Sequence, residues 1–566
     1  MSAQREFGPE VAEFLSACSQ QYDALLEASG EIRAHGNPEA ILDWVKTVAA
    51  FAAMHHPGRF ADGALENLAL EVGRQLDRTA SPPLWLESLV AQRARSAPAK
   101  RRVLHVATTM LNIGGHTRTI LNWIRKDPGS EHSLVTTSSA GVQISPVVME
   151  AIAESGGQLY VLPDESPLLS RARWLREFSR RSADLVFLHL VPYDVVPVVA
   201  FAESGGPPVA LINLADQCFW LGSTVADSVV HLREIGATTS RDIRFTRNDL
   251  LLPIPLFEAR AELSKADARR ELGIPESQIV LLTIGRGIKF APSARHNFFR
   301  TGREILDRNP AAHLYVVGVR AADHAQSPEF VAHDRMHFLG PLNDPTAYQR
   351  AADVYLEGFP FGSQTALLET ALAGTACVPA FAPATALLAT HDFALTGTVD
   401  NPADEPGYVA RVGEYAADRE KRVAIARTLR ERVLHFHVLE SWNGMLDQVY
   451  GALEKLRHDA LPLPNAKGAA RHIDLAISEY HATRANGADV RTFVDGEVRG
   501  LMRFASYTMR QRGFHADSFR LLRFANRNQV WDRESVGYAI KLLPHWLVHA
   551  ARRFMKRQDD TCREIS

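Results

Sequence analysis

The feature that most constrains the fold of this chain is a pattern that occurs twice. Short apolar runs rich in β-branched residues are each followed by a turn or loop and then by a helical segment. The first series of strand-like runs covers 101–109, 132–137, 157–162, 183–190 and 207–214, and the second covers 277–287, 312–319, 334–340, 351–359 and 375–381. Strands that alternate with helices are typical of parallel sheets with crossover helices. We therefore predict an α/β protein with two Rossmann-like domains separated by a cleft.

Helical segments flank the two series. At 566 residues the chain is too long for one compact core. Apolar residues recur at helical spacing near the amino terminus and again after about residue 470, and two prolines in 251–259 suit a connection between domains. The predicted parts are an all-α N-terminal domain (1–100), a first Rossmann-like domain on the acceptor side (101–252), a second that holds a nucleotide (253–457) and a C-terminal helical region (470–566).

Composition excludes several classes of protein. The chain has 63 Lys and Arg against 65 Asp and Glu, so it lacks the basic field expected of a nucleic-acid-binding protein. Its four cysteines are scattered without a C-x-x-C pair, which argues against a zinc knuckle or a disulfide framework. The start of the sequence does not resemble a signal peptide, and no run is long enough to cross a bilayer. We expect a cytoplasmic protein.

The segment 353–375 predicts a phosphate site. A buried strand ends in the turn Phe359-Pro-Phe-Gly-Ser, and a helix is expected to begin at Gln364 or Thr365. Unpaired N–H groups and the helix dipole at Ser363, Gln364 and Thr365 would bind a diphosphate. Glu369, one turn further along, would accept hydrogen bonds from ribose hydroxyls.

A second segment of the same domain supplies cations. Arg286 and Lys289 follow the first strand of the second series, where the carboxyl ends of parallel strands form the ligand crevice. They would stabilise a diphosphate leaving group. No D-x-D metal motif is present, so we expect no metal and assign its role to these cations. Either segment alone is common in α/β proteins, whereas both in this order favour a nucleotide-sugar site.

The run Phe359-Pro-Phe-Gly-Ser-Gln-Thr-Ala-Leu-Leu-Glu369 resembles the donor signature of bacterial adhesin N-glycosyltransferases and the related O-linked N-acetylglucosamine transferases. The resemblance covers about residues 102–455 and implies an inverting, metal-independent GT-B enzyme. It implies a UDP-sugar as donor substrate, no further cofactor, and a protein side chain as the favoured acceptor. Lys289 matches the family's diphosphate-binding Lys, and Glu369 its ribose-binding acid, usually Asp.

In the first series, Asn112-Ile-Gly-Gly-His116 resembles the acid-x-x-x-His turn of the same family, near the acceptor. Asn112 stands where an acid is usual, which puts a catalytic carboxylate there in question. His116 is predicted to take the acceptor's proton or to orient acceptor or donor phosphate. The alternative is a histidine that caps the following helix.

Further candidates lie in the same series. His189 ends a buried strand, where a structural role is the more common one. Asp216, with Gln217, follows another strand and is predicted to contact acceptor or sugar, with Asp216 as the alternative base; the alternative is that both are ordinary polar residues of a loop. Arg233, in a helical stretch, could reach the cleft, but we expect a solvated charge on a helix.

Several alternatives stay open. A retaining cell-surface polysaccharide glycosyltransferase has a similar glycine turn, but its E-x7-E pattern is absent because Phe361 stands eight residues before Glu369. A UDP-sugar epimerase and a non-catalytic binding module share the fold.

The basic, apolar stretch 541–558 suits either a membrane surface, which would make the protein peripheral, or packing on another domain, and we favour packing. Sugar, base and oligomeric state are not fixed by these patterns.

Overall fold

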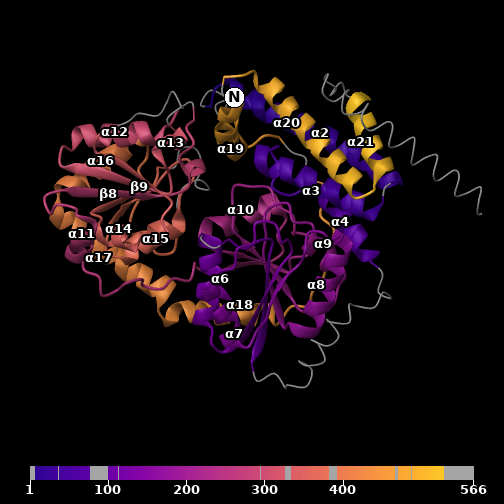
Figure 1. Ribbon diagram of the computed structural model, residues 1–566, viewed down its shortest axis with the longest axis horizontal. Coiled ribbons are helices and arrows are strands. Elements are labelled where there is room, and N and C mark those ends of the chain that lie inside the picture. The colour runs from indigo at the N-terminus through magenta and orange to yellow at the C-terminus, as the bar shows by residue number, and fades with distance from the viewer. Residues whose placement is uncertain are drawn as a thin grey trace, which may run out of the picture.

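Both predicted series form parallel sheets. The computed structural model describes residues 7–35, 37–76, 100–111, 114–293, 295–324, 333–381, 392–465, 469–485 and 487–527. A seven-stranded sheet has the order β3-β2-β1-β4-β5-β6-β7, and a five-stranded sheet has the order β10-β9-β8-β11-β12. Neighbouring strands are parallel in both sheets. The predicted fold class, α/β with two Rossmann-like domains in a GT-B-like arrangement, is confirmed (Figure 1).

The strands are short, and most of them are buried and lie in the predicted apolar runs. The strands β3 and β7 are only partly buried, and β6 and β7 lie outside the predicted runs, so the prediction that the stretch around 229–236 is helical is wrong for the residues of β6. In the first sheet they are β1 (Arg101–Ala107), β2 (Ser130–Thr136), β3 (Leu159–Val161), β4 (Leu185–His189), β5 (Val209–Asn213), β6 (Ser228–His231) and β7 (Asp249–Leu251). In the second they are β8 (Ile279–Ile284), β9 (Ala312–Val317), β10 (Met336–Gly340), β11 (Val354–Leu356) and β12 (Ala376–Val378). The strand order reverses direction beside β1 and beside β8, and the carboxyl ends of the strands there form the usual ligand crevice of such sheets.

Amphipathic helices cover both sheets. Those of the first are α6 (Gly115–Lys126), α7 (Pro146–Ser155), α8 (Leu168–Ser182), α9 (Val196–Ala200) and α10 (Glu234–Arg244). Those of the second are α11 (Lys265–Leu272), the 3₁₀ turn η1 (Gly287–Phe290), α12 (Phe298–Arg308), α13 (Ala321–His324), α14 (Thr346–Ala351), α15 (Gln364–Leu372), α16 (Glu405–Ala417), α17 (Arg419–Val433) and the π-helical turn η2 (Leu434–Val438).

One helix crosses from the second sheet to the first. Helix α18 (Glu440–Leu453) lies inside the range 253–457 predicted for the second domain. It nevertheless buries Trp442 and Tyr450 in the same apolar cluster as Trp123 of α6 and Val103 of β1. The indole N–H of Trp123 donates to the Tyr450 hydroxyl at 2.9 Å. Helix α18 is therefore part of the first domain's core.

Helices from both ends of the sequence pack together into one unit, which we call the helical body. It consists of α2 (Pro9–His35), α3 (Pro38–His55), α4 (Gly63–Arg74), α19 (His472–Ala482), the turn η3 (Thr483–Ala485), α20 (Val490–Gln511) and α21 (His515–Arg527). Figure 1 shows indigo and yellow helices side by side. Gln21 of α2 donates to Asp495 of α20 at 2.6 Å, and Arg512 pairs with Asp43 of α3 at 2.9 Å. The stretch 541–558 lies outside the described residues.

The helical body contacts both sheet domains. Gly73 of α4 lies so close to α9 that an added Cβ would come within 2.6 Å of the Val199 carbonyl oxygen. On the second domain, Arg295 donates to both carboxylate oxygens of Glu479 in α19, at 2.8 and 2.6 Å. None of the described helices is long and apolar enough to span a membrane.

Candidate functional site

The loop between β11 and α15, which we call the donor loop, lies directly on the turn η1. A Cβ added to Gly358 would come within 2.6 Å of the Phe290 ring, so only glycine lets the donor loop pack this closely on that ring. The Nζ of Lys289 donates to the carbonyl oxygen of Gly362. Phe361, in the same loop, packs against Tyr480 of α19 with ring centroids 5.7 Å apart. The two sequence segments predicted to form the donor site are therefore in contact.

Helix α15 begins at Gln364, within the predicted range. Its cap residue, Ser363, makes no side-chain capping hydrogen bond, and the first backbone bond of the helix joins the Leu367 N–H to the Ser363 carbonyl. The preceding N–H groups of the helix are thus without helical acceptors, as at any helix start. The Gln364 side chain donates to Asp392 at 2.7 Å, and Asp392 is held in turn by His437 at 2.8 Å. Gln364 can therefore offer its backbone N–H to an anion while its side chain is engaged elsewhere.

A buried carboxylate occupies this helix start. Glu357 follows β11 and accepts a hydrogen bond from the N–H of Ser363, while its Oε2 has no partner among the described residues. Burial raises the pKa of Glu357, and the Lys289 and Arg233 charges nearby lower it. Burial likewise lowers the pKa of Lys289, while Glu357 raises it and Arg286 and Arg233 lower it. Three cations and one carboxylate therefore share the space beside the donor loop.

The two domains touch each other at the starts of α6 and α15. Arg118 of α6 donates to Oε1 of Glu369, and Gln349 lies 3.5 Å from Oε2. A Cβ added to Gly115 would lie 3.1 Å from the Thr365 hydroxyl. Two helix amino termini thus face each other, and both favour negative charge between them. Glu369, the predicted ribose acid, is paired with Arg118 in this structure.

His116 lies in the first turn of α6, whose cap residue is Gly114. Its ring stacks on His189 with centroids 5.6 Å apart and planes 26° apart. Its Nε2 is buried and has no hydrogen-bond partner within the described part of the chain. Burial lowers the pKa of His116 to about 4, so the imidazole is neutral at physiological pH. Asn112, at the start of the same turn, lies outside the described residues.

Asp216 is held by cations and an amide. Arg233 donates to its Oδ2 and Asn213 to its Oδ1, the latter at 2.6 Å, while Arg244 donates to its backbone carbonyl. The prediction that Arg233 is a solvated helix charge is wrong. Its side chain is only 13% exposed because it precedes α10 and turns back onto Asp216.

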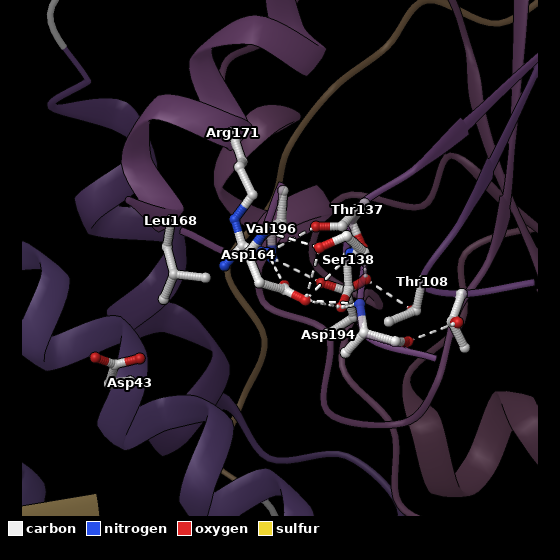
Figure 2. Close-up of polar contacts among 12 residues, drawn as sticks. Asp43, Thr108, Thr137, Ser138, Asp164, Leu168, Arg171, Asp194 and Val196 are labelled. Atoms are coloured by element: carbon white, nitrogen blue, oxygen red, sulfur yellow. Dashed lines mark hydrogen bonds and ion pairs between the residues drawn. The ribbon is translucent and has the colours of Figure 1, made fainter. Parts of the chain in front are cut away.

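Loops at the carboxyl ends of β1, β2 and β4 are tied by two carboxylates (Figure 2). Asp194 accepts hydrogen bonds from the hydroxyls of Thr108 and Thr137 and, at 3.0 Å, from the N–H of Val196. Asp164 accepts from Ser138 and Ala140 and pairs with Arg171, all within 2.9 Å. These contacts fix the first domain's side of the crevice.

Sequence reasoning missed several residues of this site. Glu357 is a polar residue at the end of a buried strand, the same signal that identified His189. Arg118 is two residues from His116 on a helix that starts at the crevice, so the predicted helix already indicated that Arg118 lies close to the site. His105 and His132 lie inside strands and contact each other only through the fold. Within the described ranges no cluster of three or more His, Cys, Asp or Glu side chains could hold a metal ion.

No protein-family model matches the chain, and no curated protein matches it. Several solved structures are similar to it. One is a mutant O-GlcNAc transferase of Thermobaculum terrenum, with 14% identity over 78% of this chain and 82% of that chain and a TM-score of 0.49. Another is HepE of Anabaena with UDP and glucose, with 13% identity over 63% of this chain and 100% of that chain and a TM-score of 0.47. A third is WaaG, a glycosyltransferase involved in lipopolysaccharide biosynthesis, with 16% identity over 62% of this chain and 100% of that chain and a TM-score of 0.45. At these identities and scores they say nothing of the activity of this chain.

Proposed function

We propose that the chain is a glycosyltransferase that moves a sugar from a UDP-sugar to a protein side chain without a metal ion. The observation that carries this proposal is the convergence at the cleft. The start of α15, the cations Lys289 and Arg286, and the carboxylate of Glu369 lie on one side, and the start of α6 with His116 lies on the other. This arrangement suits a ligand that carries both a diphosphate and a ribose.

The donor would bind along α15. Its diphosphate would accept hydrogen bonds from the N–H groups of Gln364 and Thr365, close to Lys289 and Arg286, whereas the N–H of Ser363 already donates to Glu357. The ribose would take the place of Arg118 on Glu369. As the bond between the sugar and the diphosphate breaks, the negative charge that develops on the leaving group is stabilised by these cations and amides. Such preorganised charge supplies the stabilisation that a divalent metal supplies in other sites.

The acceptor would approach from the first domain. His116 is neutral and lies in the first turn of α6, where the two domains touch, so it can take a proton from the attacking group. Asp216 is the alternative base, and both of its carboxylate oxygens already accept hydrogen bonds, from Arg233 and Asn213. In this assignment the donor site belongs to the second domain and the proton acceptor to the first, so that transfer needs both domains together.

Calorimetric titration of the full chain with UDP, GDP, dTDP and CMP, with and without magnesium, tests the donor site. We expect selective binding of UDP that does not depend on magnesium and that is lost in Glu369→Ala. Glu304→Ala is the matched control, because Glu304 is an exposed acid on α12 that pairs with its helix neighbour Arg308, away from the cleft. Binding of no nucleotide would refute the proposal and leave the non-catalytic module.

Transfer itself is tested with radiolabelled UDP-sugars and a lysate of acceptor proteins. Lys289→Ala should lower transfer at saturating donor by about 100-fold, the loss seen when one charge-stabilising group is removed. Release of a modified sugar without any acceptor would point instead to an epimerase. Retention of the anomeric configuration in the product would point to the retaining alternative.

A further inference from the structure

Beneath His116 the first domain contains a row of histidines that crosses three neighbouring strands. His132 lies on β2, His105 on β1 and His189 on β4, and all three are fully buried. Nδ1 of His105 is 3.1 Å from Nε2 of His189, and Nε2 of His105 is 3.1 Å from Nδ1 of His132. The row is thus one continuous chain of hydrogen bonds.

The far end of the row fixes the direction of every hydrogen bond. Nε2 of His132 lies 3.2 Å from both the carbonyl oxygen and Oδ2 of Asp127, which can only accept. His132 therefore donates through Nε2 and accepts through Nδ1 when neutral. His105 must then donate to His132 and accept from His189. It follows that Nδ1 of His189 carries a lone pair, and this atom is buried without a partner in the described residues.

The near end of the row almost reaches His116. Its ring centroid lies 5.6 Å from that of His189, and the two hydrogen-bonded pairs of the row have centroids 5.3 Å apart. The difference is small enough that a rotation of the His116 ring would bring its Nε2 within hydrogen-bond distance of Nδ1 of His189. Both nitrogens lack other partners in the described part of the chain, so both are available for this bond.

From this geometry we infer that His116, His189, His105, His132 and Asp127 form a proton relay that runs from the contact between the domains to the hydrogen bond between His132 and Asp127. The inference rests on the proposed function, in which His116 accepts the proton of the attacking group. His116 would be the catalytic residue, and the other four would be positioning residues that act through it.

The relay carries one positive charge from His116 to His132 by a series of proton transfers. As the acceptor atom bonds to the sugar carbon and the diphosphate leaves, the acceptor's proton passes to Nδ1 of His116. The Nε2 proton of His116 moves to Nδ1 of His189, that of His189 to Nδ1 of His105, and that of His105 to Nδ1 of His132. His132 then bears two protons beside the Asp127 carboxylate. When the products have left, the same steps run in reverse, and Nδ1 of His116 releases the proton to water.

The surroundings of the row favour this direction. Burial lowers the pKa values of His105 and His189 well below 6.5, so neither holds the charge for long. Burial raises the pKa of Asp127, but hydrogen bonds from His132 and Tyr450 lower it below its ordinary value. The charged or titratable groups that act on the row are His116 of α6 and Asp127, the residue after α6, and, through Asp127, Tyr450 of α18 and Arg101 of β1. Of these, Asp127 and Arg101 carry charges at neutral pH.

Replacing the central ring tests the relay. His105→Phe keeps an aromatic ring beside Trp123 and Phe187, which both pack on His105, and removes its two ring nitrogens. His313→Phe is the control, because it breaks a histidine pair of the same geometry, with centroids 5.3 Å apart, in the second domain. We expect His105→Phe to lower single-turnover transfer by about 100-fold with unchanged UDP affinity. A plot of the transfer rate against the deuterium fraction of the solvent should be curved for the unmodified protein and linear for His105→Phe.

A second readout needs no activity. Nitrogen NMR of the full chain, labelled at histidine and assigned with single variants, should show His189, His105 and His132 as neutral rings protonated at Nε2. A proton on Nδ1 of His189 in the resting protein would overturn the inference, as would a His105→Phe variant with the original rate and curvature. If UDP binds but His105→Phe behaves as the control, only the relay fails. If no UDP-sugar is used at all, the proposed function fails, and the NMR spectrum still decides whether the row exists.

Discussion

Donor binding should be coupled to proton uptake at Glu357. This carboxylate accepts a hydrogen bond from the N–H of Ser363, at the helix start where the donor's diphosphate is proposed to bind. Burial raises its pKa to about 7. A diphosphate beside it would repel the ionised form, so the donor should bind mainly to molecules in which Glu357 is protonated.

The size of the effect follows from that pKa. The protonated fraction is about 0.9 at pH 6 and about 0.1 at pH 8, so the affinity should fall about tenfold over this range. Because the proton is held in the complex and lost from the free protein, the loss occurs as the pH rises through 7. A tenfold change corresponds to about 1.4 kcal/mol of binding free energy.

Titration calorimetry with UDP-glucose at pH 6, 7 and 8 measures this dependence, because the diphosphate diester itself has no group that titrates in the range. Glu357→Gln should bind with nearly constant affinity, since the amide cannot ionise. Glu304→Gln, on the exposed face of α12, should keep the original dependence. A flat profile for the unmodified protein, or a tenfold fall that persists in Glu357→Gln, would refute the reasoning.

Two further predictions concern stability and the closure of the cleft. Glu66 of α4 is fully buried, accepts hydrogen bonds from Gly222 and Thr224, and has its pKa raised to about 7 by burial. The pKa of this carboxyl in the unfolded chain is 4.5. The free energy of unfolding should therefore fall by about 3 kcal/mol as the pH rises from 4.5 to 7 and then stay constant. Urea unfolding of Glu66→Gln should lack this fall, and an equal fall in both proteins would contradict the assignment. Gly115→Val places a branched side chain against Thr365, whose hydroxyl lies 3.1 Å from the position that the new Cβ would take, and should hold the domains apart. Transfer should drop while UDP affinity stays the same, and loss of UDP binding would show that the change damages the donor site instead.

The fold was predictable because its signals are local. Ten of the twelve strands in the described part of the chain lie in an apolar run of a few residues bounded by turn formers, as in 183–190 around β4, whereas β6 and β7 have no such run. The start of α15 could be placed within two residues because Pro, Gly and Ser in the donor loop end the preceding strand. The position of α18 could not be predicted, since its Trp442 and Tyr450 would suit the apolar face of either sheet.

The parts of the site that were not predicted depend on contacts between distant residues. Arg118 and Glu369 are 251 positions apart in the sequence, and neither suggests the other. His105 and His132 read as ordinary strand residues until the register of β1 and β2 brings them together. Arg233 looked solvated because its partner, Asp216, belongs to another loop. A sequence pattern marks the ends of strands well, but it does not show which strand ends become neighbours.

The helical body sets an order on the events of synthesis. Helix α2 leaves the ribosome hundreds of residues before α20, against which it packs. The face of α2 that contacts α20 therefore stays uncovered while both sheets are synthesised. Joining such distant segments costs only slightly more entropy than joining near ones, but contacts of this range form slowly. The nascent chain would therefore carry an uncovered apolar surface beside an already assembled first sheet. Chaperones that cover exposed apolar surfaces would therefore act mainly on this surface, before α19 and α20 are synthesised.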